Sequence, residues 1–274
     1  MKTCKVIAVA NQKGGVGKTT TTGALGVGLA REGNRVLLID LDAQANLTMS
    51  LGYQNPDELP VTITDYLGMV IEDRDASTLN GILALPSGVS LIPSNIQLSG
   101  LETALVNTMS RESVFRACVQ DLRPLYDYIL IDCSPSLGML TINALTASDS
   151  VLIPVQAHFF PAKGLELLLS TVRKVRRQMN PSLQVEGILL TMMDYRSTFV
   201  RDMAVTLRDT YGSIRVFQTE IPASVRAVET GAQGLAIYDY DPKGKVAQAY
   251  MALAKEMLAL QRQEPMKRPT DRER

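Results

Sequence analysis

Residues 5–20 read KVIAVANQKGGVGKTT, and this stretch decides the fold of the chain. A short aliphatic run leads into a glycine loop, and a helix-forming segment follows the loop. This order of strand, glycine turn and helix amino terminus is the context that a phosphate-binding P-loop requires. Glycines let backbone N–H groups approach phosphate oxygens, and the amino end of the helix adds a positive dipole. The stretch therefore predicts a nucleotide site.

Three side chains of this loop have separate expected roles. Lys18 should reach the β- and γ-phosphates of ATP, and the Thr19 hydroxyl should bind Mg²⁺. Thr20 is placed for a contact with the α-phosphate. The predicted phosphate-binding residues are Gly14, Gly15, Val16, Gly17, Lys18, Thr19 and Thr20.

Lys13 is the informative departure from the general P-loop pattern, which would have glycine at the position of Gln12. An additional lysine beside a phosphate-binding loop is electrostatically useful only when an anion lies within its reach. The sequence therefore indicates a second contact between the loop and a nucleotide.

Acidic residues follow two other aliphatic runs, at positions 40, 42 and 132. Parallel sheets place their ligands at the carboxyl ends of their strands. Asp40 and Asp42 are two residues apart in an extended segment, so both can face one site. One of them can support hydrated Mg²⁺ while the other orients the attacking water. Asp132 ends the run YILID and is expected to hold Mg²⁺ through water.

The rest of the chain alternates short aliphatic runs with helix-length segments. This alternation predicts an α/β fold, a doubly wound and mostly parallel sheet with helices on both faces. The expected strands are 5–10, 35–40, 89–93, 128–132, 150–155, 184–191 and 214–217. The expected helices are 18–31, 96–108, 111–122, 137–146, 162–179, 199–211 and 242–261. Prolines 56, 60 and 86 mark a looser excursion between the second and third strands.

We expect a single domain over residues 1–263. The segment 264–274 has two prolines and seven charged residues, which predicts a disordered charged tail.

Composition limits the possible partners. The 274 residues include 28 basic and 28 acidic side chains, so any site for nucleic acid or membrane must be a local patch. The three cysteines are too widely spaced for a disulfide framework or a zinc cluster. No apolar run approaches the roughly 20 residues of a spanning helix, and the amino terminus is not a secretory signal. A cytoplasmic protein is expected.

Several stretches together resemble the ParA/Soj partitioning ATPases, with their deviant Walker A loop, within the MinD/ParA class of P-loop proteins. They read KGGVGKTT (13–20), LIDLDAQAN (38–46), IDCSPSLGMLTINAL (131–145) and VLIPVQ (151–156). Segments 188–194, 221–229 and 240–245 are also similar, so the resemblance covers about residues 4–260. Proline is usual in the family where Ala43 and Ser134 stand, and neither position supplies a phosphate ligand.

The resemblance implies a homodimer that encloses ATP and Mg²⁺, with Lys13 reaching the partner's nucleotide. It assigns catalysis to Lys13, Lys18 and Asp42, with Asp42 the acidic residue needed for slow intrinsic hydrolysis, and metal binding to Thr19, Asp40 and Asp132. It places adenine near Met192 or Met193 and near Pro222. ATP-bound dimers of the family bind double-stranded DNA without sequence preference, and a ParB-like centromere-binding partner stimulates hydrolysis and releases them. A nucleoid-associated protein without a membrane partner is therefore expected.

Two groups of arginines are candidates for the DNA contact. Arg173, Arg176 and Arg177 share one face of the expected helix 162–179. Arg196 and Arg226 match DNA-contacting positions of Soj-like relatives. No base-reading motif accompanies either group, so contacts with phosphates are favoured over sequence readout.

Other members of the class suggest alternative functions. A MinD-like positioning ATPase would need a carboxyl-terminal amphipathic helix, and residues 261–274 lack an apolar face; flotation with liposomes would decide. An iron–sulfur protein would need two cysteines per chain at the subunit interface, and a colourless protein would exclude it. A tyrosine kinase is suggested by Tyr238 and Tyr240 and would phosphorylate itself. A non-enzymatic adaptor is disfavoured because every nucleotide-site residue is present.

Overall fold

The computed structural model describes residues 3–157 and 162–263. The charged segment predicted for 264–274 lies outside these ranges.

A twisted sheet forms the middle of the molecule, with the strand order β3-β4-β2-β5-β1-β6-β7. Every neighbouring pair is parallel except β3 and β4. The central strands are buried on both faces, which explains their nearly continuous aliphatic sequences. The strands are β1 (Lys5–Val9), β2 (Val36–Leu41), β3 (Leu83–Ala84), β4 (Ser90–Ile92), β5 (Tyr128–Cys133), β6 (Ser150–Gln156) and β7 (Gln184–Thr191).

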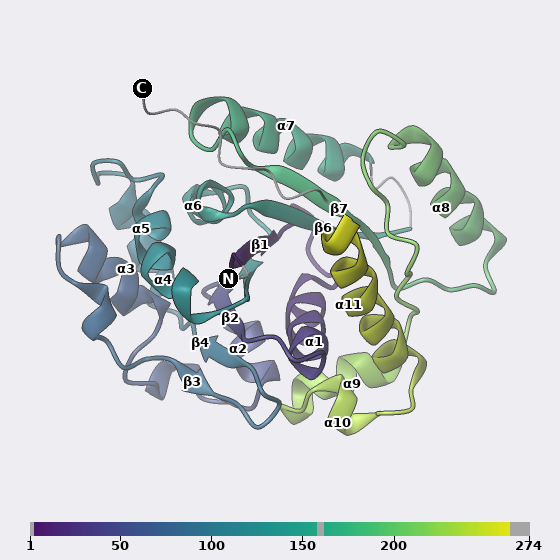
Figure 1. Cartoon of the computed structure of the whole chain (residues 1–274), viewed down its shortest axis with the longest axis horizontal. Helices are drawn as coiled ribbons and strands as arrows, with labels where there is room; N and C mark the ends of the chain where they lie inside the picture. The colour runs from purple at the N-terminus through teal and green to yellow at the C-terminus, as the bar shows by residue number, and fades with distance from the viewer. Residues whose placement is uncertain (1–2, 158–161, 264–274) are drawn as a thin grey trace.

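Helices cover both faces of the sheet and bury two separate apolar clusters (Figure 1). One cluster lies under helices α3 (Ile63–Ile71), α4 (Leu98–Leu105), α5 (Val114–Leu122), α6 (Met139–Ala147), α7 (Ala162–Gln178) and α8 (Thr198–Thr210). The other lies under α1 (Lys18–Arg31), α2 (Asn46–Ser50), α9 (Val225–Gln233), α10 (Ile237–Tyr240) and α11 (Lys245–Gln263). The predicted doubly wound α/β fold is confirmed.

The structure corrects several details of the prediction. Segment 214–217 is not a strand, because it makes only an isolated bridge between Val216 and Ile188. The short antiparallel β3 was not predicted. Helices α2, α3, α9 and α10 were also missed, and α3 lies inside the region expected to be loose. All four of these helices have nine residues or fewer, too few for a clear helical period.

The order of the strands brings the predicted site together. From β1 the chain continues to β2 on one side of the sheet, and β6 lies on the other side of β1. Strand β5 pairs with both β1 and β2, and in its register Asp132 is opposite Asp40 on β2 and Val9 on β1. The glycine loop and the two acidic strand ends therefore meet at one edge of the sheet.

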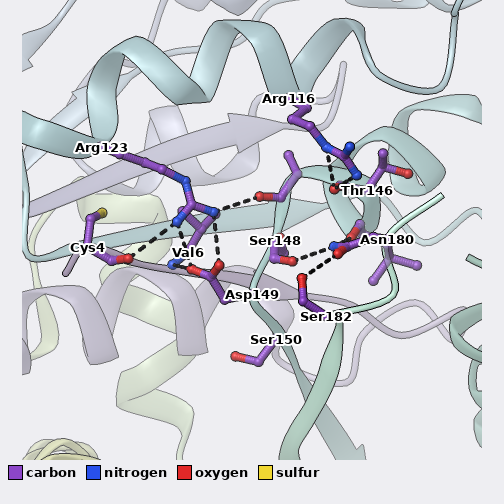
Figure 2. A network of polar contacts seen from close by, with 12 residues as sticks. Cys4, Val6, Arg116, Arg123, Thr146, Ser148, Asp149, Ser150, Asn180 and Ser182 are labelled. Carbon is purple, nitrogen blue, oxygen red and sulfur yellow. Dashed lines mark hydrogen bonds and ion pairs between the residues drawn. The ribbon is translucent and has the colours of Figure 1, made fainter. Parts of the chain in front are cut away.

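The opposite edge of the sheet carries a network of polar contacts around the amino ends of β1 and β6 (Figure 2). The guanidinium of Arg123 donates to both carboxylate oxygens of Asp149, at 3.1 and 3.0 Å. Asp149 also accepts the backbone N–H of Val6 at 2.7 Å. Nearby, the amide of Asn180 donates to the carbonyls of Leu145 and Ser148. These contacts join strands and helix ends that are distant in the sequence.

Candidate functional site

The glycine loop between β1 and α1 has the backbone that phosphate binding needs. Gly15 and Gly17 have φ angles of 69° and 83°, in the left-handed region that other residues rarely adopt. Gly17 directly precedes the first turn of α1. A Cβ atom placed on Gly14 or Gly15 would meet no atom within 4 Å, so the loop backbone faces open space. The loop is thus an uncovered cradle of N–H groups at a helix amino end.

Asn11 fixes the base of this loop. Its amide nitrogen donates to the carbonyl of Pro154 on β6 at 2.7 Å, and its amide oxygen accepts the backbone N–H of Lys13 at 3.0 Å. The ammonium group of Lys18 donates to the carbonyl of Lys13 at 3.3 Å. The backbone of Lys13 is therefore held from both sides, while the residue itself is exposed. The role of Asn11 was not predicted, although the residue stands inside the motif 5–20.

Lys18 is a buried cation, with 7% of its surface exposed. Burial lowers the pKa of its ammonium group, and the carboxylates of Asp132 and Asp42 act in the opposite direction. A buried ammonium beside an open phosphate cradle is suited to bind an anion, because little water competes for it.

Asp132, at the end of β5, is 1% exposed and accepts the hydroxyl of Thr19 at 2.7 Å. Burial raises the pKa of this carboxyl well above its usual range, and the nearby Asp40 raises it further. The structure thus brings together Thr19 and Asp132, two of the three residues predicted to bind Mg²⁺.

Asp40 is fully buried, and its carboxylate is already engaged. One oxygen, Oδ2, accepts the backbone N–H and the hydroxyl of Thr48 at 2.9 and 2.7 Å. The other, Oδ1, accepts the N–H of Asp42 at 3.2 Å. Burial raises the pKa of Asp40 to about 6, although these hydrogen bonds lower it in part. Asp42 is half-buried beside it, at the start of the loop that leads to α2.

A cavity of about 920 Å³ extends from the glycine loop toward α9. Met192 and Pro222, both predicted to lie near adenine, line it together with Thr19 and Thr20. Met192 has a left-handed backbone with φ of 53°, and its methyl group faces Gly17. Of the two methionines offered as alternatives, Met193 is 2% exposed and packs in the core. The left-handed backbone of Met192 breaks the extended chain beyond β7, and Met193 then forms a bridge with Pro222.

The donor set fits a hard cation bound together with phosphate oxygens. Among the residues that the structure describes, no three His, Cys, Asp or Glu side chains are grouped to hold a metal ion by themselves. Thr19 and Asp132 nevertheless offer oxygen atoms beside the open cradle, and Mg²⁺ characteristically combines one or two protein ligands with substrate phosphates and water.

The cysteines do not support the iron–sulfur alternative. Cys118 and Cys133 are buried at 4% and 1% exposure, and Cys133 forms the last residue of β5. Neither thiol is at a surface where two subunits could share a cluster. Tyr238 is also buried, and its hydroxyl donates to the carbonyl of Ala24, so this tyrosine packs against α1.

The candidate DNA-binding arginines occupy two separate places. Arg173, Arg176 and Arg177 are exposed on α7, while Val172 and Val175 of the same helix are buried. Helix α7 packs on one face of the sheet and α9, which carries Arg226, on the other (Figure 1).

Arg196 and Arg226 lie beside the cavity and are both ion-paired. Arg196 makes a two-point contact with Asp194 at 2.9 and 3.0 Å, and its side chain is 91% exposed. Arg226 pairs with Asp241 at 3.0 Å and is 63% exposed. Exposed pairs of this kind are weak, so a phosphate can compete for the guanidinium.

The fold and the site define a P-loop nucleotide-binding protein. A family model described as AAA domain matches residues 4–185. The sporulation initiation inhibitor protein Soj of Bacillus subtilis is 44% identical over 259 residues, which is 93% of this chain and 98% of that protein. The chromosome partitioning protein ParA of Caulobacter vibrioides is 40% identical over 260 residues, covering 94% and 95%. The chain therefore belongs to the ParA-type family of P-loop ATPases.

The fold is also found in a solved structure named as cobyrinic acid a,c-diamide synthase from Mycobacterium smegmatis with bound ATP analog and magnesium. The TM-score is 0.82 at 36% identity, and the match covers 96% of this chain and 97% of that one. None of the helices within the described ranges is both long and apolar enough to cross a membrane.

Proposed function

We propose that this chain is a partitioning ATPase whose ATP-bound dimer binds DNA without sequence preference and is released by hydrolysis. One observation carries the proposal. The exposed Lys13 stands on a glycine loop whose buried lysine and acidic neighbours are arranged for ATP and Mg²⁺. The relatives named as Soj and ParA support partitioning as the process.

Lys13 supports the dimeric part of the proposal. Its backbone is fixed by Asn11 and Lys18, so the base of the side chain is held in place. The residue is exposed, so its side chain can meet a second molecule. A lysine in this position can neutralise a triphosphate of a second copy when two cavities face each other. The resemblance to ParA/Soj proteins implies the same contact in trans.

Different residues of the chain have different roles in ATP hydrolysis. Thr19 would hold Mg²⁺ directly, and Asp132 and Asp40 would hold it through water. The bound ion would neutralise charge on the phosphates. Asp42 orients the attacking water, and the two loop lysines stabilise charge on the transferring phosphoryl group. Loss of a water-orienting group costs roughly 10²–10⁴ in rate. Intrinsic turnover is slow because a ParB-like partner completes the site.

Arg196 and Arg226 are the preferred DNA contacts. They stand beside the cavity, so closure of two nucleotide-loaded subunits can align four arginines on one surface. The α7 arginines are on the other layer of the fold and form a second, independent candidate. A protein with this DNA surface is cytoplasmic and associated with the nucleoid.

The test is duplex binding by Asp42→Ala, which should retain ATP. Fluorescence anisotropy with a duplex of arbitrary sequence should detect binding with ATP and Mg²⁺ and none with ADP. Arg196→Ala combined with Arg226→Ala should weaken binding and make its salt dependence shallower, by roughly 0.9 in slope for each phosphate that is no longer neutralised. A matched control replaces Arg35 and Arg74, which are also exposed and ion-paired. Equal affinity and slope in both double variants would reject this DNA surface.

A second function is suggested by the solved structure named as a diamide synthase. That structure holds an ATP analog and magnesium, and an activity of this kind in the present chain would make turnover depend on cobyrinic acid. Partitioning predicts that turnover is unchanged by cobyrinic acid and responds to DNA. Stimulation by cobyrinic acid alone would favour the synthase.

A further inference from the structure

A polar cluster that no sequence motif predicted lies behind the acidic loop. Thr48, in the middle of α2, is fully buried. It donates its backbone N–H and its hydroxyl to the same oxygen of Asp40, at 2.9 and 2.7 Å. Its hydroxyl oxygen also accepts the backbone N–H of Ser94, just beyond β4, at 3.0 Å. Thr48 thus links the ends of two neighbouring strands, β2 and β4, to the loop that follows Asp42.

The cluster is not explained by packing. Thr48 and Ser94 are both 0% exposed, and the strands around them are aliphatic. Within the described residues, the hydroxyl of Ser94 is buried without a hydrogen-bond partner. Buried polar atoms reduce stability unless they are paired, and the hydroxyl of Thr48 pairs with both the Asp40 carboxylate and the N–H of Ser94. The polar choice at position 48 therefore indicates a role in the arrangement of the loop.

The loop from Asp42 to Thr48 is tied to Asp40 at both ends. At one end the N–H of Asp42 donates to Asp40 Oδ1 at 3.2 Å, and at the other end Thr48 donates to Oδ2. Between them, Ala45 has a left-handed backbone with φ of 52°, and its N–H donates to the carbonyl of Asp42 at 2.9 Å. The position of the Asp42 side chain depends on this closed turn.

We propose that Thr48 is a positioning residue for ATP hydrolysis. Its hydroxyl holds Asp40 and thereby keeps Asp42 where it orients the attacking water. The inference rests on the proposed function, because it needs Asp42 to act in hydrolysis. Thr48 does not itself line the cavity, so its loss should slow the chemical step more than it weakens the binding of the nucleotide.

The decisive variant is Thr48→Val, which keeps the shape of the side chain and removes its hydroxyl. We expect the turnover number to fall roughly 10- to 100-fold, since small misplacements of a catalytic group have effects of this size. The dissociation constant for a non-hydrolysable ATP analogue, measured without Mg²⁺ so that metal binding by Asp40 does not contribute, should stay within about threefold. Thr48→Ser restores the donor and should recover turnover to within about twofold. The matched control is Thr206→Val, an exposed threonine of α8 whose hydroxyl bonds only its own helix.

The outcomes separate the two proposals. If the unaltered protein does not hydrolyse ATP with Mg²⁺, the proposed function fails. If it does, and Thr48→Val turns over at the same rate, only the positioning role fails. Equal loss of analogue binding and turnover, or no recovery in Thr48→Ser, would indicate a merely structural role and overturn the inference. Should Thr48→Val not fold, Thr48→Cys provides a weaker donor of similar size, and its turnover number should be reduced while analogue binding is kept.

Discussion

The two edges of the sheet differ in whether their charged side chains are neutralised within the chain. At the amino ends of β1 and β6, Arg123 and Asp149 neutralise each other and also bond backbone groups of neighbouring segments (Figure 2). At the carboxyl ends of β2 and β5, Asp132 and Asp42 act on the buried Lys18, Asp40 lies beside Asp132, and burial raises the pKa of Asp40 and Asp132.

The difference separates a structural site from a site built for a ligand. The Arg123 network is complete within the chain, so its removal should reduce stability without changing nucleotide affinity. The opposite edge retains buried charges, and a cation bound together with phosphates is their best partner. Removing one of these charged side chains should therefore reduce nucleotide affinity more than it reduces stability. Variants at each edge, measured for both stability and nucleotide affinity, test this difference.

The largest effect is expected for Lys18→Ala. The ammonium group is buried beside the phosphate cradle, and truncating one partner of a buried charge pair costs about 2–5 kcal/mol. ATP affinity should therefore fall at least about 30-fold, while the Tm of the nucleotide-free protein stays near that of the unaltered chain. Isothermal titration and thermal unfolding measure the two quantities. Retention of affinity within a few-fold would contradict the assignment.

Arg123→Ala should do the reverse. The side chains of Arg123 and Asp149 are 33% and 39% exposed, so we expect a loss of only about 1–3 kcal/mol of unfolding free energy. The melting temperature should fall by several degrees, and affinity for ATP should not change. Arg35→Ala is the matched control, because Arg35 pairs with Asp127 at the same edge and its own side chain is 60% exposed. A larger drop in Tm for Arg35→Ala would show that the network is not what stabilises this edge.

Asp132→Asn should stabilise the nucleotide-free protein while impairing its function. The amide removes a buried charge that lies next to Asp40 and still accepts the Thr19 hydroxyl. An increase on the order of 1 kcal/mol would raise Tm by roughly 2–4 °C. The further rise in Tm that ATP with Mg²⁺ gives the unaltered protein should be much smaller in the variant. If the variant had a lower Tm than the unaltered protein, and ATP with Mg²⁺ still raised that Tm by the full amount, this interpretation would be contradicted.

The smallest effect concerns pH. Burial raises the pKa of Asp40 from its ordinary 3.8 to about 6, so the folded chain takes up a proton more readily than the unfolded chain. The contribution to stability is therefore present below pH 4 and is lost as pH rises through about 6. Mg²⁺ needs the ionised carboxylate, so Mg²⁺-dependent ATP affinity should weaken as pH falls from 7 to 5. Titrations of ATP with and without Mg²⁺ across this range test it, and an unchanged Mg²⁺ effect at pH 5 would contradict it.

The sequence predicted the ligand-binding edge better than the structural edge, for physical reasons. The loop 11–20 and the acidic residues at 40, 42 and 132 are recognisable because their chemistry depends on adjacent residues in the chain. The sheet follows from aliphatic runs that are buried on both faces.

Contacts between distant residues could not be predicted in this way. Arg123, ahead of β5, and Asp149, ahead of β6, meet because both strands pair with β1, and no spacing marks them as a pair. Thr48 looks like an ordinary residue of a short polar segment until β4 is placed beside β2. Met193 was assigned with Met192 because sequence alone does not tell which side of the chain faces the cavity.

The most direct test of the proposed ATP-dependent dimer is the molar mass of the Asp42→Ala variant, measured by light scattering after size exclusion. With ATP and Mg²⁺ the proposal predicts a dimer, with ADP a monomer, and with ATP a monomer again when Lys13→Ala is added while ATP still binds. A dimer of Asp42→Ala, Lys13→Ala with ATP, as stable as that of Asp42→Ala alone, would contradict the claim that Lys13 completes the partner's site.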